Sequence, residues 1–120
     1  MHELSVAQGI IEIIYSNVPK ERLSDVRSVV TKIGAFSGVV ADSLEFSYQA
    51  ITIDTELQKS FLVFERIPFV IACGDCSKES ENNDGLAQCS LCGSLNTKIC
   101  SGTELQVKEI ELEDQKEETV

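Results

Sequence analysis

The chain is organised around the stretch "CGDCSKESENNDGLAQCSLC", residues 73–92, which holds two CxxC pairs separated by twelve residues. A CxxC pair forms a tight turn that directs two thiolates at one point, and two such pairs complete the tetrahedron of ligands that zinc accepts. The loop between the pairs is polar and can reverse direction readily, and Gly74 and Gly93 are expected at the two turns. This spacing predicts a zinc site with the ligands Cys73, Cys76, Cys89 and Cys92.

Residues 73–100 are rich in Ser, Asn and Gly and have few large apolar side chains, so we expect this module to depend on a metal for its fold. Four sulfur ligands leave no open coordination position, and the predicted zinc is therefore structural, not catalytic. A redox-active CxxC pair and an iron centre are the alternatives. Cys100 lies outside both pairs and is expected to be a partly covered free thiol; a regulatory or alternative ligand role is the other interpretation.

The first helix is predicted from apolar residues that recur at alternating intervals of three and four: Leu4, Ala7, Ile11, Ile14 and Val18. A capping box of Ser5 and Gln8 would start this helix after Leu4. We therefore expect its start within residues 3–6, which leaves Met1 and His2 ahead of the helix.

Three strands and a second helix are predicted further along the chain. Residues 25–34 fit both helical and strand spacing, but their β-branched content favours a strand. Residues 60–67 are apolar and aromatic, which is typical of a largely covered strand, and residues 103–113 alternate with a change of phase after Val107 that indicates a bulge. The second helix is predicted over residues 39–51, with one face formed by Leu44, Tyr48 and Ile51.

Charge and length exclude several classes of function. The chain has 120 residues and a net charge of −10, which repels phosphate backbones and anionic lipid surfaces, so no nucleic-acid or membrane partner is expected. In the segment from Cys73 to Gly102, two lysines oppose four carboxylates, which leaves no basic patch. Neither a secretory signal nor an apolar run long enough to span a bilayer is recognisable. The odd number of five cysteines favours metal binding in a reducing compartment, the cytoplasm.

Met1 and His2 together form a chelating group at the amino terminus. The terminal amine, the backbone nitrogen of His2 and its imidazole can bind one ion through fused small rings, and the backbone nitrogen of Glu3 is next in line. Four nitrogens in a plane suit Ni(II) or Cu(II) and suit zinc poorly. The Glu3 side chain can supply a carboxylate, orient the imidazole or cap the helix. The alternative interpretation is that His2 is an end residue without a role.

Four segments follow one another along the chain: "MHELSVAQ" (1–8), "IGAFSGVVADSLEF" (33–46), the two CxxC pairs and "GTELQVKEIELE" (102–113). Together they resemble the HypA/HybF family of hydrogenase nickel-incorporation accessory proteins. The resemblance implies a nickel metallochaperone in which His2 is a nickel ligand, with the Met1 amine and Glu3 beside it, and the four paired cysteines hold structural zinc. Some relatives carry histidines next to their cysteine pairs; this ribbon has none, so no nickel ligand is expected from it.

The fold that the resemblance implies is α+β, a three-stranded sheet with two helices and a zinc ribbon inserted between the second and third strands. The element order above agrees with it. The nickel-binding domain is then expected at residues 1–70 and 103–114, the zinc ribbon at 71–102 and an acidic tail at 115–120. The implied partners are the GTPase HypB and the hydrogenase large subunit precursor. Some members also serve urease, which adds urease accessory proteins to the candidate partners.

The leading hypothesis is a carrier that binds Ni(II) at its N-terminus and delivers it for the maturation of nickel–iron hydrogenase. No covalent reaction is expected, because the lone histidine lies at a chain end and no arrangement of nucleophile, acid and base is recognisable. The alternative is a zinc-ribbon adaptor that docks on a protein partner while His2 has no role. A third reading is a thiol redox protein whose CxxC pair oxidises reversibly.

Overall fold

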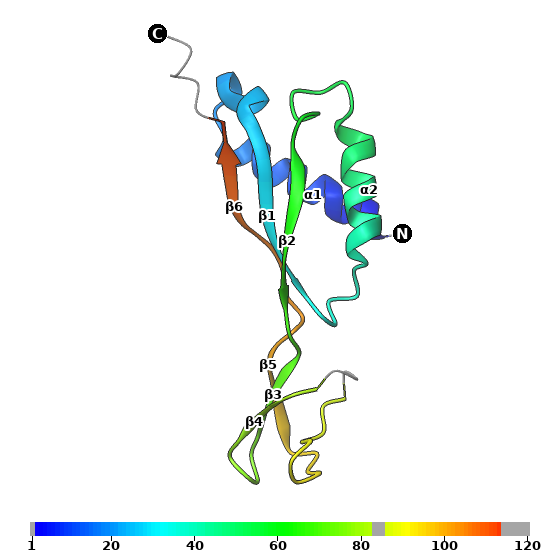
Figure 1. The fold of residues 1–120 in the computed structure, drawn as a ribbon, viewed down its shortest axis with the longest axis vertical. Coiled ribbons are helices and arrows are strands. Elements are labelled where there is room, and N and C mark those ends of the chain that lie inside the picture. The colour runs from blue at the N-terminus through cyan, green and yellow to red at the C-terminus, as the bar shows by residue number, and fades with distance from the viewer. Residues whose placement is uncertain (1, 83–85, 114–120) are drawn as a thin grey trace. The chain divides into compact units, whose positions relative to one another are not determined.

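The structure is a computed structural model that describes residues 2–82 and 86–113, with the backbone alone for His2. Met1, residues 83–85 and the predicted acidic tail at 115–120 lie outside the described residues. The elements, labelled in Figure 1, are α1 (His2–Asn17), the 3-10 helix η1 (Lys20–Asp25), β1 (Val26–Gly34), α2 (Ala41–Thr52), β2 (Phe61–Ile67), β3 (Val70–Cys73), β4 (Glu79–Glu81), β5 (Thr97–Ser101) and β6 (Leu105–Leu112).

These strands form two separate sheets of three strands each. One has the order β2-β1-β6, and the other has the order β4-β3-β5 with antiparallel pairs on both sides of β3. The second sheet lies between β2 and β6 in the chain, so the predicted α+β fold with an inserted ribbon is confirmed. The strands within the ribbon were not predicted, because they are only 3 to 5 residues long and lack a clear apolar alternation.

Two compact units divide the chain. The first contains Met1–Thr31, Val39–Phe64 and Val107–Val120, and the second contains Lys32–Gly38 and Glu65–Gln106. The boundaries expected after residues 70 and 102 fall inside the second unit, which also takes in the ends of β1 and β2 and the start of β6.

The helix α1 begins at His2, earlier than the residues 3–6 that were expected, so His2 is part of the helix and not ahead of it. A contact far along the chain accompanies this start: the backbone N–H of Val40 donates to Glu3 Oε2 at 3.2 Å. A contact between residues 37 positions apart cannot be recognised from local sequence spacing. The capping box of Ser5 and Gln8 can, which is why the later start was predicted. The buried face of α1 comprises Ala7, Ile10 and Ile14, and Val18, directly after the helix, is also buried.

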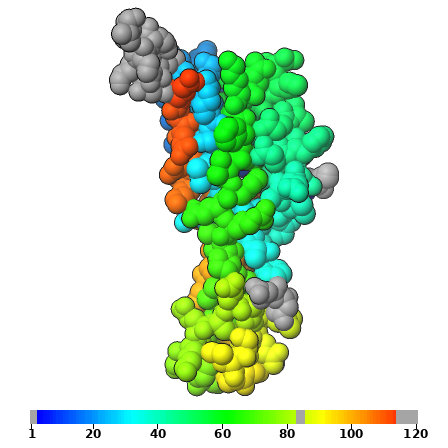
Figure 2. All heavy atoms as spheres, in the orientation of Figure 1, coloured from blue at the N-terminus to red at the C-terminus, as the bar shows by residue number. Residues whose placement is uncertain are grey.

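Both helices contribute to a core with the β2-β1-β6 sheet, and the predicted strands at 25–34, 60–67 and 103–113 all exist (Figure 1). On β6 the side chains that pack against the core are Val107, Ile110 and Leu112, which confirms the predicted change of phase. In α2 the predicted face is confirmed for Leu44 and Tyr48, which are fully buried. The atoms of α2 also form part of the molecular surface in Figure 2. Phe46 on this helix is 74% exposed.

Thr31 in β1 carries a hydroxyl that opposes folding. The residue is 1% exposed and its Oγ1 has no hydrogen-bond partner among the described residues. We expect Thr31→Val to raise the free energy of unfolding by about 1–2 kcal/mol, because an unpartnered buried hydroxyl costs this much relative to a methyl group. Urea unfolding followed by circular dichroism measures the change.

Thr52 provides the matched control, since it is also 1% exposed but its hydroxyl donates to the Tyr48 carbonyl at 2.8 Å. Thr52→Val removes that hydrogen bond and should lower the free energy of unfolding by about 1 kcal/mol. An equal loss of stability in both valine variants would contradict the account of Thr31.

Within the second unit, residues 34–36 and residues 102–104 meet through backbone hydrogen bonds. Gly34 N donates to Glu104 O and Phe36 N donates to Gly102 O, each at 2.8 Å. A Cβ atom on Gly34 would lie 2.2 Å from the carbonyl carbon of Gly102, and Gly102 itself has a φ of +112°. Glycine is therefore required at both positions. The rings of Phe36 and Phe69 pack edge to face nearby, with centroids 5.1 Å apart.

Candidate metal centres

The structure brings together the four cysteines predicted as zinc ligands, and their sulfur atoms all lie within 4.8 Å of one another. The Sγ atoms of Cys73 and Cys92 are 3.6 Å apart, and those of Cys76 and Cys89 are 3.7 Å apart. In a tetrahedral site with zinc–sulfur bonds of about 2.3 Å, neighbouring sulfurs are about 3.8 Å apart, whereas a disulfide requires about 2 Å. The sulfur spacing therefore fits four cysteines that bind one metal ion and does not fit disulfide bonds.

Each CxxC pair has the same backbone geometry, in which amides point at the first sulfur. Cys73 Sγ accepts from Asp75 N at 3.3 Å and from Cys76 N at 3.4 Å. Cys89 Sγ accepts from Leu91 N and Cys92 N, both at 3.4 Å. Such hydrogen bonds stabilise a thiolate before and after it binds a metal.

The turns themselves differ from the expectation at one position. Gly93 has a φ of +80°, as its predicted place in a turn suggests, but the corresponding residue of the first pair is Ser77, with a φ of +63°. In both turns this residue donates its N–H to the carbonyl of the first cysteine, at 3.0 Å and 2.9 Å. Gly74 instead lies against Asn96: a Cβ atom there would come 2.7 Å from Asn96 Nδ2, so a larger residue would have to displace this side chain.

Hydrogen bonds and burial around the cluster give the cysteine thiols different pKa values. Hydrogen bonds from Cys92 N and Leu91 N lower the pKa of Cys89 to about 6, and the pKa of Cys73 is lowered chiefly by the amide of Cys76. The amide of Ser94 also acts to lower the pKa of Cys92, but contact with the Cys73 thiol and burial outweigh it and raise that pKa to about 12. The lowered pKa favours the thiolate form of Cys89, and a divalent cation that binds the cluster displaces the remaining protons.

One connection between the two CxxC turns was not predicted. The Asp75 carboxylate accepts hydrogen bonds from Ser94 Oγ and from Asn96 Nδ2, and these hydrogen bonds lower the pKa of Asp75, that from Ser94 the most. No spacing rule marks this contact in the sequence, since it joins residues 19 and 21 positions apart.

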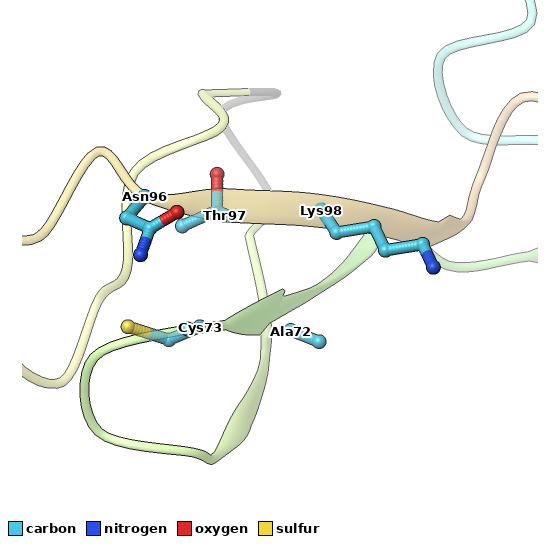
Figure 3. Close-up of a pocket in the computed structure, with 6 residues that line it drawn as sticks. Ala72, Cys73, Asn96, Thr97 and Lys98 are labelled. Atoms are coloured by element: carbon cyan, nitrogen blue, oxygen red, sulfur yellow. The ribbon is translucent and has the colours of Figure 1, made fainter.

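A shallow pocket of about 220 Å³ lies beside the cysteine cluster, between the end of β3 and the start of β5. Figure 3 shows Cys73 and Asn96 at one end of this pocket and the side chain of Lys98 extending toward the other. Its ionisable side chains are Cys73, which belongs to the cysteine cluster, and Lys98.

The predicted nickel ligands are placed only in part. Met1 lies outside the described residues, and the backbone of His2 forms the first residue of α1. Three roles were open to the Glu3 side chain, and the structure shows a capping contact. It accepts from the Val40 N–H at the start of α2, and so caps α2 and not α1.

Cys100 is a free thiol, as predicted, but it is exposed and not partly covered. Its Sγ lies 4.0 Å from Glu79 Oε2. In the part of the chain that the structure describes, every helix is too short or too polar to cross a lipid bilayer.

Comparison with known proteins identifies relatives along almost the whole chain. The family model described as hydrogenase/urease nickel incorporation, metallochaperone HypA, matches residues 1–112. The hydrogenase maturation factor HypA of Geotalea uraniireducens is 39% identical over 113 residues, which cover 94% of this chain and 100% of that protein. The factor of the same name from Geobacter metallireducens is 40% identical over the same shares of both chains.

Solved structures agree with the fold. The solution structure of the Ni metallochaperone HypA from Helicobacter pylori covers 96% of this chain and 100% of its own, with a TM-score of 0.65 and 22% identity. This likeness concerns the fold alone. The family is one of metallochaperones and maturation factors and not of enzymes, in agreement with the absence of a predicted catalytic site. From the family match over residues 1–112 and from the curated relatives, the chain belongs to the HypA family of nickel-incorporation metallochaperones.

Proposed function

We propose that this protein binds Ni(II) through the Met1 amine, the backbone nitrogen and imidazole of His2 and the backbone nitrogen of Glu3. It then delivers the ion for maturation of nickel–iron hydrogenase. One observation carries the proposal: the family match starts at residue 1 and so includes the Met-His-Glu terminus together with the cysteine ribbon. The proposed partners are the GTPase HypB, the hydrogenase large subunit precursor and urease accessory proteins, in the cytoplasm.

The start of α1 supports this nickel chemistry. The first N–H groups of an α-helix have no partner within the helix, so the backbone nitrogens of His2 and Glu3 do not have to break a helical hydrogen bond to bind an ion. The Glu3 carboxylate is engaged with Val40 N, which leaves the backbone nitrogen as the contribution we assign to Glu3. A planar set of four nitrogens suits Ni(II).

For the cysteine cluster we propose structural zinc, with Cys73, Cys76, Cys89 and Cys92 as ligands and residues 71–102 as the ribbon. Sulfur donors select soft or borderline ions such as zinc over magnesium or calcium, and the sulfur spacing fits a tetrahedral site. Bound zinc supplies a cross-link between two turns that share little apolar surface. We assign nickel binding to residues 1–70 and 103–114.

A protein-docking role of the ribbon is the second candidate, and exposed leucines favour it. Leu91 and Leu95, in and just after the second CxxC pair, are 61% and 78% exposed. In a pure adaptor the amino terminus would have no part, so nickel binding separates the two functions.

Blocking the amino terminus tests the proposed function. Calorimetric titration of Ni(II) into the native protein should show one site, and a variant with residues added before Met1 should bind nickel at least about 100-fold more weakly, because the terminal amine is no longer a ligand. A variant with the same residues added after Val120 is the control and should bind as the native protein does. Equal affinity of both extended variants would refute the terminal site.

A further inference from the structure

The two CxxC turns come from separate parts of the chain, and side chains next to the cysteines connect them directly. Asp75 Oδ2 accepts from Ser94 Oγ, and Asp75 Oδ1 accepts from Asn96 Nδ2 at 3.3 Å. Ser94 Oγ in turn accepts from Asn96 N at 3.0 Å, and Gly74 N donates to Asn96 O at 2.8 Å. One carboxylate from inside the first pair thus holds the residues that follow the second pair.

Asp75 and Ser94 each also contact a cysteine of their own turn. The backbone N–H of Asp75 donates to Cys73 Sγ at 3.3 Å, and the carbonyl of Ser94 accepts from Cys89 N at 2.9 Å. The side-chain contact between Asp75 and Ser94 therefore completes a chain of contacts from Cys73 to Cys89. This chain of contacts needs no metal ion.

The charge of Asp75 alone would act against metal binding. Four thiolates around a divalent ion carry a net charge of −2, and a carboxylate on the neighbouring residue disfavours a further accumulation of negative charge. The presence of a carboxylate here is consistent with hydrogen bonds from Asp75 that favour metal binding more than its charge opposes it.

We propose that Asp75 is a positioning residue that latches the second CxxC turn onto the first through Ser94 and Asn96, and so holds the four thiols ready for zinc. The proposal rests on the zinc role assigned above to the four cysteines. Zinc binding then costs less conformational entropy, because the two turns are already held together before the ion arrives.

Zinc affinity, measured by competition with a chromophoric chelator, tests the latch. Asp75→Ala should weaken zinc binding about tenfold, the lower end of the loss seen when a contact that supports a ligand is removed. The spectrum of the cobalt-loaded variant should stay that of a tetrahedral four-thiolate site, because the ligands are unchanged. Glu81→Gln removes the same charge from an exposed position on β4 and should leave the affinity unchanged.

A double-mutant cycle separates the latch from a general loss of stability. Ser94→Ala should weaken zinc binding in the wild-type background and have little further effect in the Asp75→Ala background, because the contact is already lost. If Asp75→Ala does not fold, Asp75→Asn carries the test: it keeps one acceptor oxygen, and zinc binding should weaken less than with alanine but in the same direction.

Two results would overturn the latch alone: unchanged or tighter zinc binding by the Asp75 variants, as charge repulsion predicts, or fully additive effects of Asp75→Ala and Ser94→Ala. Failure of the wild-type protein to bind one zinc ion would overturn the proposed zinc role and the latch together. The two failures are therefore distinguishable.

Discussion

Nickel binding should be lost in His2→Ala while the fold and the zinc content stay unchanged. His2 is the only histidine of the chain, so the variant removes the imidazole and one chelate ring, with no other imidazole to replace it. We expect the affinity for Ni(II) to fall at least about 100-fold, since loss of a ligand exceeds the 10–100-fold loss typical of a contact that only supports a ligand. Calorimetric titration of nickel into the untagged variant measures this.

Ser5→Ala is the matched control for that experiment. Ser5 lies in the first turns of α1 and is exposed, so its substitution disturbs the same helix start without removing a proposed ligand. Its nickel affinity and circular dichroism spectrum should equal those of the wild-type protein. If His2→Ala binds nickel like Ser5→Ala, the terminal site is refuted and the adaptor function gains the support that the carrier loses.

The second large effect is expected for Cys89→Ser, which should abolish stoichiometric zinc binding and unfold the second CxxC turn. Cys89 is 2% exposed, and its sulfur accepts two backbone amides while facing Cys76 Sγ at 3.7 Å. A hydroxyl does not form the thiolate that zinc requires, and without the ion this ribbon has little apolar burial to hold it. Metal analysis of the purified protein and hydrogen exchange of residues 86–101 measure the two effects.

Cys100→Ser is the control, because Cys100 is an exposed free thiol outside the cluster. It should keep full zinc content and protection from exchange. Nickel binding at the amino terminus should persist in both variants, since the proposed nickel ligands are not among the cysteines. Retention of a protected ribbon by Cys89→Ser, or reversible oxidation of one pair without loss of zinc, would favour the redox interpretation instead.

Local spacing was sufficient for much of this protein. The CxxC pairs at 73–76 and 89–92 predicted the cluster because the turn geometry of such a pair is determined by the residues within it. Likewise the buried residues Leu44 and Tyr48 on α2, and the change of phase between Val107 and Ile110 on β6, follow from helix and strand periods that operate over a few residues.

Other features depended on contacts between distant residues. The reach of Glu3 to Val40 and the requirement for glycine at 34 and 102 arise where segments far apart in sequence come together. The short strands β3 and β5 form because they pair with each other, a partnership that neither segment reveals alone.

By itself, then, the sequence predicted the two α-helices, the three strands of the β2-β1-β6 sheet, the cluster of four thiols and the candidate terminal chelate, because each prediction uses residue types at short, regular spacing. Only the tertiary structure decided that Glu3 binds the Val40 N–H, that glycine is obligatory at 34 and 102 and that Asp75 joins the two CxxC turns through Ser94 and Asn96. These depend on which distant atoms approach within hydrogen-bonding or van der Waals distance, and the chain must fold before that is settled.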